Sequence, residues 1–358
     1  MSLDALRGLD MFWIIGGEGI FAPLAALTGW QIWRYGEQQV RHTAWHGFTF
    51  YDLIFPLFIF LSGVTLGLSP RHLPDLPWSE RRKSYLRAVR RLGLLVLLGI
   101  VYNSAWGQGI HADLSQIRYA SVLGRIGIAW FVAAMLVWHI RSWRTVAAIS
   151  GAILLTYWVV VAALGDLTQE GCVHGWIDQH LLPGIRYRNR AYDPEGLLST
   201  VAATVNALLG YLAGTWLRRD NLNGWAKSGM LLLAGAALLG TGWLWHLVFP
   251  VNKELWTSSF VLVTCGWGAM LLAAFYAVID VGGLRRTAWP LAAIGANAIV
   301  VYLASSLVDW EHTASSLFGG LIRVTPEQWQ NLLGVLALLL VQWIPLAWLY
   351  RRKIHIRV

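Results

Sequence analysis

Charged residues are scarce in this sequence. They make up 13% of its 358 residues, whereas hydrophobic residues make up 56% and tryptophan alone occurs 22 times. Soluble globular proteins carry about 25% charged residues, so this composition excludes a soluble domain. Cysteine is also scarce: the chain has only Cys172 and Cys265. Two cysteines without the spacing of a zinc site predict neither a metal centre nor a disulfide. The composition therefore predicts a polytopic membrane protein.

Long apolar runs recur along the whole chain, each able to cross about 30 Å of hydrocarbon. We expect an all-α integral membrane protein with about ten transmembrane helices, forming a single domain over residues 1–358. The first span contains acidic residues and follows no basic leader, so we expect it to stay in the mature protein rather than to act as a signal peptide. The expected spans are 5–27, 49–69, 88–107, 119–140, 145–164, 195–217, 228–249, 257–280, 290–308 and 328–350.

Lysine and arginine lie mostly in the loops after the even-numbered spans and in the C-terminal tail. By the positive-inside rule, both termini are then cytosolic, and the loops 28–48 and 165–194 are extracytoplasmic. This asymmetry accounts for the net charge of +9, so we expect no nucleic-acid partner. The basic run from Arg81 to Arg91 could also attract anionic membrane lipid or an anionic cofactor. We favour the simpler interpretation, in which the run is a topology signal.

Ionisable residues gather where the first two spans meet the extracytoplasmic side. His42 and His46 precede the second span, and Asp52 lies in its first turn. Glu18 lies in the outer half of the first span. Charged groups are costly near hydrocarbon, so such a gathering is typical of a site that handles a proton, an ion or a polar substrate. We expect His42 to act as a general base beside Asp52 and Glu18, while capping of the helix is the alternative role for Asp52.

The spacing of His42 and His46 could suit a metal ion on a helix. A glycine follows His46 directly and no third ligand is indicated, so we expect no metal. Three of the other polar residues inside expected spans bear on a binding site. Arg7 lies three residues after Asp4, and we expect the two to neutralise each other. Arg125 needs a carboxylate partner or an anionic ligand, whereas Asn297 is suited to hydrogen bonds between helices.

Motifs along nearly the whole chain are similar to those of one family. The segments are Ser2–Gly8 (SLDALRG), His42–Gly47 (HTAWHG) with Asp52–Pro56 (DLIFP), Val122–Gly127 (VLGRIG), Tyr192–Leu197 (YDPEGL), Asn252–Trp256 (NKELW), Asp280–Leu284 and Gly295–Ala298 (GANA). With these motifs the chain resembles the transmembrane heparan-alpha-glucosaminide N-acetyltransferase family, and in particular its compact bacterial relatives. The first motif is shared with other membrane acyltransferases, whereas the motifs at His42 and Tyr192 are specific.

This resemblance implies an enzyme that moves the acetyl group of cytosolic acetyl-CoA to the amine of a glucosamine-type sugar on the far side of a bacterial inner membrane. His42 aligns with the family's catalytic histidine. Glu18 and His46 stand where the animal enzyme has asparagines, a difference that concerns donor contacts and substrate choice. A homodimer is left open. We expect contacts with acetyl-CoA from Arg7, Arg125 and Asn297, and contacts with the sugar from Trp45, His46, Asp193 and Glu195.

Two points stay open at the level of sequence. Transfer could be direct, with His42 as the base, or could pass through an acetyl-histidine, and the residues alone favour neither. Glu18, Arg125 and Asn297 would also suit a proton-coupled transporter of amino sugars or small peptides, although no inverted repeat is evident. A membrane O-acyltransferase would keep the histidine base and differ only in its acceptor.

Overall fold

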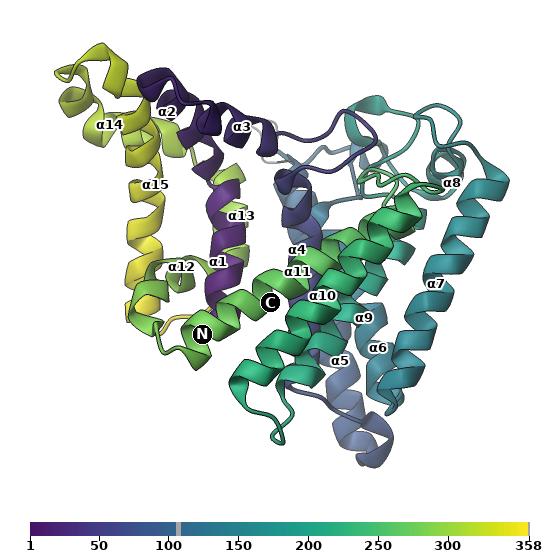
Figure 1. Ribbon diagram of the computed structural model, residues 1–358. Coiled ribbons are helices and arrows are strands. Elements are labelled where there is room, and N and C mark those ends of the chain that lie inside the picture. Colours follow the sequence, from purple (N-terminus) through teal and green to yellow (C-terminus); the bar gives the residue numbers. More distant parts are fainter. Residues whose placement is uncertain (105–108, 357–358) are drawn as a thin grey trace. The chain divides into compact units, whose positions relative to one another are not determined.

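The computed structural model describes residues 1–104 and 109–356 of the chain (Figure 1). Every long regular element in these two ranges is a helix, and the β pairing found there is one isolated bridge between Arg118 and Gly184. A helix satisfies all of its backbone hydrogen bonds internally, which is what a segment surrounded by hydrocarbon requires. The expectation of an all-α fold is therefore confirmed.

The chain forms two compact units. The first unit comprises Met1–Thr43, Thr49–Ile54 and Phe275–Val358. The second unit comprises Ala44–Phe48 and Phe55–Ala274. The segment that carries the candidate histidines is thus divided, with His42 in the first unit. A single domain over residues 1–358 stays a prediction.

The first unit joins the two ends of the chain. Its helix α1 (Ser2–Ile14) packs along α12 (Arg285–Gly295). Gly8 lies at this contact, where a Cβ atom would come within 1.8 Å of the carbonyl oxygen of Leu291. Only glycine lets the two backbones approach so closely. The other helices of the unit are η1 (Gly17–Ile20), α2 (Phe21–Thr28), α3 (Gln31–Gln39), the π-helix η5 (Tyr276–Val281), α13 (Ala298–Leu307), α14 (Trp310–Arg323) and α15 (Glu327–Arg351).

The first expected span is bent. α1 ends at Ile14, and the chain turns at Gly16, which has a φ of 114°, before η1 leads into α2. The two halves meet at an angle of 63°. A break of this kind frees backbone groups that must find other partners. The carbonyl oxygen of Ile15 accepts a hydrogen bond of 2.7 Å from Nε2 of Gln342 on α15.

The second unit is built around α9 (Leu197–Leu217), which is largely buried. The part of α4 (Phe50–Leu68) from Phe55 onward packs against it through glycines. A Cβ atom on Gly63 would lie 1.9 Å from the carbonyl oxygen of Ala207. Small residues at such crossings allow the van der Waals packing that holds helices together in an apolar medium. The other long helices of the unit are α5 (Trp78–Ser104), α6 (Val122–His139), α7 (Trp143–Leu164), α8 (Val173–Leu181), α10 (Gly224–His246) and α11 (Ser258–Phe275).

The number of spans differs from the expected ten. Within the described ranges, seven helices are long and apolar enough to cross a membrane, or nine if each of two bent pairs is one span. The bent pairs correspond to the expected spans 5–27 and 290–308. The expected span 88–107 lies on α5 as far as Ser104, and residues 105–107 lie outside the described residues. α5 begins at Trp78 and includes a basic first half, so it is less apolar than the seven. The count of ten and the side of each terminus are not confirmed.

Candidate active site

The first unit brings His42 and Asp52 together. Nδ1 of His42 lies 2.8 Å from Oδ1 of Asp52. The His42 side chain is 52% exposed, whereas that of Asp52 is fully buried. The ring of Tyr51 lies beside the imidazole, with 4.8 Å between the ring centroids. A solvent-accessible imidazole is therefore anchored on a buried carboxylate, and the catalytic role of this pair stays a prediction.

The start of α4 explains why Asp52 is held so firmly. Its Oδ2 lies 3.2 Å from the backbone nitrogen of Thr49 and 3.1 Å from the Thr49 hydroxyl. The backbone nitrogen and the hydroxyl of Thr43 lie 3.5 Å and 3.2 Å from the same oxygen. Asp52 thus caps the helix and binds His42 at once, so the two roles considered from sequence do not exclude each other. A carboxylate surrounded by donors stays an acceptor, and it fixes the imidazole with its proton on Nδ1.

Glu18 lies on η1, just beyond the break after α1. Its Oε2 is buried and has no hydrogen-bond partner. The expected gathering of Glu18 with His42 and Asp52 is therefore not seen as a direct hydrogen bond. Its contribution to catalysis stays a prediction.

Trp45 and His46 lie in the second unit. Nε1 of Trp45 donates a hydrogen bond of 2.7 Å to the carbonyl oxygen of Leu167, and its ring packs against that of Tyr192. Nδ1 of His46 lies 3.3 Å from the side-chain amide of Asn252. Burial lowers the pKa of His46, and the charge of the nearby His246 lowers it further. His46 is thus a neutral hydrogen-bonding group at neutral pH. Binding of the sugar by these two residues stays a prediction.

Asp193 and Glu195 share one partner, Arg118, in the second unit. Nε and Nη2 of Arg118 donate hydrogen bonds of 2.8 Å and 2.7 Å to the two oxygens of Asp193, and Nη2 also bonds Glu195. Burial alone would raise the pKa of Asp193, but the two bonds from Arg118 outweigh it and hold that pKa below its usual value. The two carboxylates expected to contact the sugar are therefore already engaged in an internal ion-pair network.

Arg125 is buried inside α6, with 2% of its surface exposed. Its guanidinium bonds the hydroxyls of Thr200 and Ser199 and the carbonyl oxygen of Pro194, and it lies 4.6 Å from the ring of Trp256. No carboxylate of the described residues reaches it directly, and its Nη1 is buried without a hydrogen-bond partner. The sequence led us to expect either a carboxylate or an anionic ligand beside Arg125. No carboxylate of the described residues lies at contact distance, and an anionic ligand stays a prediction.

Arg7 and Asn297 have internal partners. Nη1 of Arg7 lies 3.4 Å from Asp4, which confirms the expected pair. Asn297 stands at the break between α12 and α13. Its amide nitrogen donates to the carbonyl oxygen of Ile354 at 3.1 Å, and its amide oxygen accepts from the backbone nitrogen of Ile356 at 2.8 Å. Asn297 therefore fastens the C-terminal tail. Contacts of either residue with acetyl-CoA stay predictions.

Sequence reasoning missed the partners of the outer-loop carboxylates. Arg118 lies in a loop, and nothing in its local sequence indicated that it would bind these carboxylates. Arg190 and Tyr192 both bind the carboxylate of Glu254, with Arg190 at 3.0 Å. Glu254 lies in the NKELW motif (Asn252–Trp256), but no local pattern indicated its partners. Cys172 and Cys265 are both free and buried. In the described parts of the chain, no three metal-ligating side chains come together.

Comparison with known proteins places this geometry in a family. A family model described as an acyltransferase domain matches residues 2–351. The chain belongs to this acyltransferase family. It is 26% identical to the heparan-alpha-glucosaminide N-acetyltransferase of Mus musculus, over 86% of the chain and 54% of the relative. It is 27% identical to the protein of the same name from Homo sapiens, over 86% of the chain and 53% of the relative. The chain thus spans about half the length of these curated relatives, and the resemblance inferred from its motifs is confirmed.

Proposed function

We propose that this acyltransferase moves the acetyl group of cytosolic acetyl-CoA to the amine of a glucosamine-type sugar outside the cytoplasm, in a bacterial inner membrane. The pair formed by His42 and Asp52 carries the proposal. Within an acyltransferase family, a solvent-accessible imidazole bound to a buried carboxylate is the arrangement expected of a general base or an acyl carrier. The names of the curated relatives supply the acetyl group and the glucosaminide.

The pair suits both routes of transfer. In direct transfer, the amine attacks the thioester carbonyl carbon, a C–N bond forms and the C–S bond breaks. With Nδ1 committed to Asp52, Nε2 of His42 takes the proton that the amine loses, and the thiolate leaves and is then protonated. Asp52 stabilises the resulting imidazolium. In the two-step route, Nε2 itself attacks the thioester carbonyl carbon, the C–S bond breaks and the thiolate leaves. The amine then attacks the acetyl group, the bond from the acetyl carbon to Nε2 breaks, and the released imidazole takes the proton that the amine loses.

The first bent span offers groups for the donor. Acetyl-CoA supplies the activated acetyl group at the end of a long arm that carries two amides and a hydroxyl. Asp10 Oδ2, Trp13 Nε1 and Glu18 Oε2 are buried and meet no hydrogen-bond partner among the described residues. An unmet buried polar group costs about 1–3 kcal/mol. Asp10 and Trp13 lie on α1 and Glu18 lies on η1, so these three groups lie on both sides of the bend. Among the predicted donor contacts, Arg125 has a buried nitrogen, Nη1, that meets no hydrogen-bond partner in the described part of the chain.

Labelled acetyl-CoA tests the function. Purified protein in detergent should transfer label to glucosamine, and His42→Ala should abolish the transfer. His312→Gln on α14 is a control, because it also removes an imidazole from the first unit but should leave transfer intact. Uptake of unmodified glucosamine into vesicles, without transfer of label, would instead support a transporter and contradict the proposal. Rapid quenching without acceptor separates the routes, because only the two-step route leaves label on the protein.

A further inference from the structure

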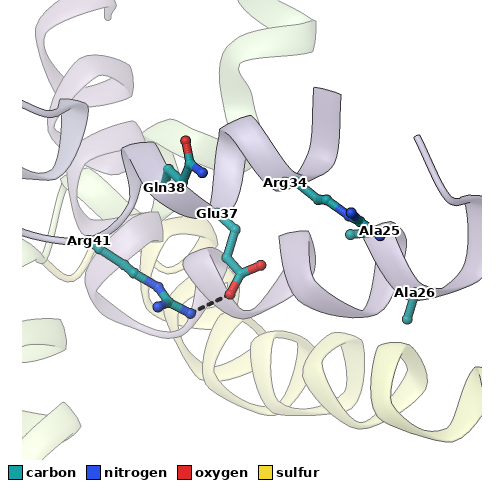
Figure 2. A pocket seen from close by; sticks show the side chains of 6 residues that line it. All are labelled: Ala25, Ala26, Arg34, Glu37, Gln38 and Arg41. Carbon is teal, nitrogen blue, oxygen red and sulfur yellow. Dashed lines mark hydrogen bonds and ion pairs between the residues drawn. The ribbon is translucent and has the colours of Figure 1, made fainter. Parts of the chain in front are cut away.

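The first unit contains a cavity of about 350 Å³ between α2 and α3. Its lining combines two alanine methyl groups with four polar side chains. Pockets for small molecules measure about 300–1,000 Å³, so this one suits a single sugar ring better than a long oligosaccharide. Figure 2 shows the lining residues, which are Ala25, Ala26, Arg34, Glu37, Gln38 and Arg41.

The charges of the cavity are unbalanced. Arg41 bonds Glu37 one turn before it on α3, so these two charges offset each other. Arg34 has no acidic partner among the described residues, and Figure 2 shows it extended toward Ala25. A guanidinium presents a planar fork of donors that matches a carboxylate, sulfate or phosphate. One free arginine beside an ion pair therefore favours an anionic ligand.

The cavity is tied to the candidate active site by short contacts within the first unit. The carbonyl oxygen of Arg41 accepts a hydrogen bond of 2.7 Å from the Thr49 hydroxyl, which also lies 3.1 Å from Oδ2 of Asp52. The side-chain oxygen of Gln39 accepts a bond of 3.2 Å from the backbone nitrogen of Phe50, at the start of α4. The wall of the cavity therefore leads directly into His42, and both are fixed to the same helix end.

We propose that this cavity binds an anionic group on the acceptor sugar, and that Arg34 is the residue that recognises it. The inference rests on the proposed function, because it assigns the acceptor of the same reaction to a chemical class. A sugar that carries a carboxylate, sulfate or phosphate besides its amine is bound through Arg34, with its amine directed to the imidazole. Glucosamine has no anionic group for Arg34 to bind, so it lacks this contact and is the poorer acceptor.

Kinetics with two acceptors test the assignment. For the unaltered protein, the KM for glucosamine 6-phosphate should be about tenfold below that for glucosamine, the value of one charge-assisted contact. Arg34→Gln should raise the KM for glucosamine 6-phosphate to about that for glucosamine. Arg34→Lys keeps the charge without the fork and should restore part of the difference. Arg323→Gln on α14 is the matched control, since it removes the same charge from the first unit outside the cavity.

Three outcomes decide the matter. Equal KM values for both sugars, or the same effect from Arg34→Gln and Arg323→Gln, would overturn the assignment while leaving acetyl transfer in place. If neither sugar is acetylated, calorimetric binding of glucosamine 6-phosphate that Arg34→Gln weakens would support the cavity although the proposed function fails. If Arg34→Gln weakens only the binding of phosphatidylglycerol in nanodiscs, the cavity is a lipid site and the acceptor assignment is wrong.

Discussion

Two histidines of this protein lie in contrasting surroundings. His42, in the first unit, is half exposed and places Nδ1 on the carboxylate of Asp52. His174, in the second unit, is 2% exposed, and its Nε2 lies 2.6 Å from the hydroxyl of Tyr157. Its Nδ1 is buried without a hydrogen-bond partner. Burial, with a smaller contribution from the charge of Arg125, lowers the pKa of His174 to about 4.

The contrast shows what makes an imidazole available for catalysis. A base must be reached by the substrate, and its protonated form must be stabilised by a neighbour. His42 meets both conditions through its exposure and through Asp52. His174 meets neither, because burial opposes its protonation and its partner is a neutral phenol. The first histidine is suited to proton transfer, and the second to holding helices together.

The largest effect should come from replacing His42 by a residue that cannot act as a base, with His174 as the comparison. His42→Ala should lower kcat by about 10³-fold or more, since a positioned base contributes roughly 10²–10⁴. His174→Gln should leave kcat within about threefold, because glutamine can still bond the hydroxyl of Tyr157. Initial rates of label transfer measure both. The contrast between the two histidines is wrong if His174→Gln lowers kcat as much as His42→Ala does while both variants are equally well folded.

Removing the charge of Asp52 should be the next largest effect. Asp52→Asn should lower kcat by about 10²- to 10³-fold with little change in KM. An amide that donates to Nδ1 moves the imidazole proton to Nε2, which then cannot take a proton from the amine. Asp52→Ala, which leaves the tautomer free, is the informative companion. An asparagine variant with unaltered kcat would show that the carboxylate only caps α4.

Breaking the ion-pair network of Arg118, Asp193 and Glu195 in the second unit should lower the stability of the protein rather than its kcat. Arg118→Ala leaves Asp193 and Glu195 without their cation, which costs about 3–5 kcal/mol for a buried pair, and less here because Arg118 is 15% exposed. Thermal unfolding in detergent should show a lower midpoint, with Arg323→Ala as the exposed control. Equal midpoints for these two variants would mean that the network contributes little.

The smallest effect at neutral pH, and one that grows on acidification, concerns His174. Its folded pKa of about 4 lies below its ordinary value of 6.5, so the unfolded chain binds the proton more tightly. Stability is therefore complete above pH 6.5 and falls as the pH drops toward 4. At pH 5 the loss should be about 2 kcal/mol, at 1.36 kcal/mol for each pH unit. His174→Gln should flatten this part of the pH profile of the unfolding midpoint, and an unchanged profile would contradict the assignment.

Local patterns allowed part of this structure to be predicted. Asp52 stands at the start of an apolar run, where a helix begins, and His42 precedes it by a loop short enough to fold back. Asp4 and Arg7 lie three residues apart on one helix, so their contact follows from helix geometry alone. The long apolar runs defined most helices for the same reason, since each run must satisfy its own backbone.

Contacts between distant segments could not be predicted. Arg118 and Asp193 meet although three α-helices, α6, α7 and α8, lie between them in the chain. Asn297 binds a tail more than fifty residues later. The bends in two spans were missed as well. The chain turns at Gly16, which has a positive φ, just after α1 ends at Ile14. Such outcomes depend on the energies of competing long-range partners, which spacing along the chain does not reveal.

The hydroxyl of Thr49 has one proton and two acceptors within reach, the carbonyl oxygen of Arg41 at 2.7 Å and the carboxylate of Asp52 at 3.1 Å. It can serve only one of them at a time. A positive charge on the imidazole of His42 weakens the hydrogen bond that the Asp52 carboxylate accepts from the Thr49 hydroxyl. Loss of that charge strengthens this hydrogen bond again. A single rotating hydroxyl can thus transmit the protonation state of His42 to the backbone that carries the neighbouring cavity.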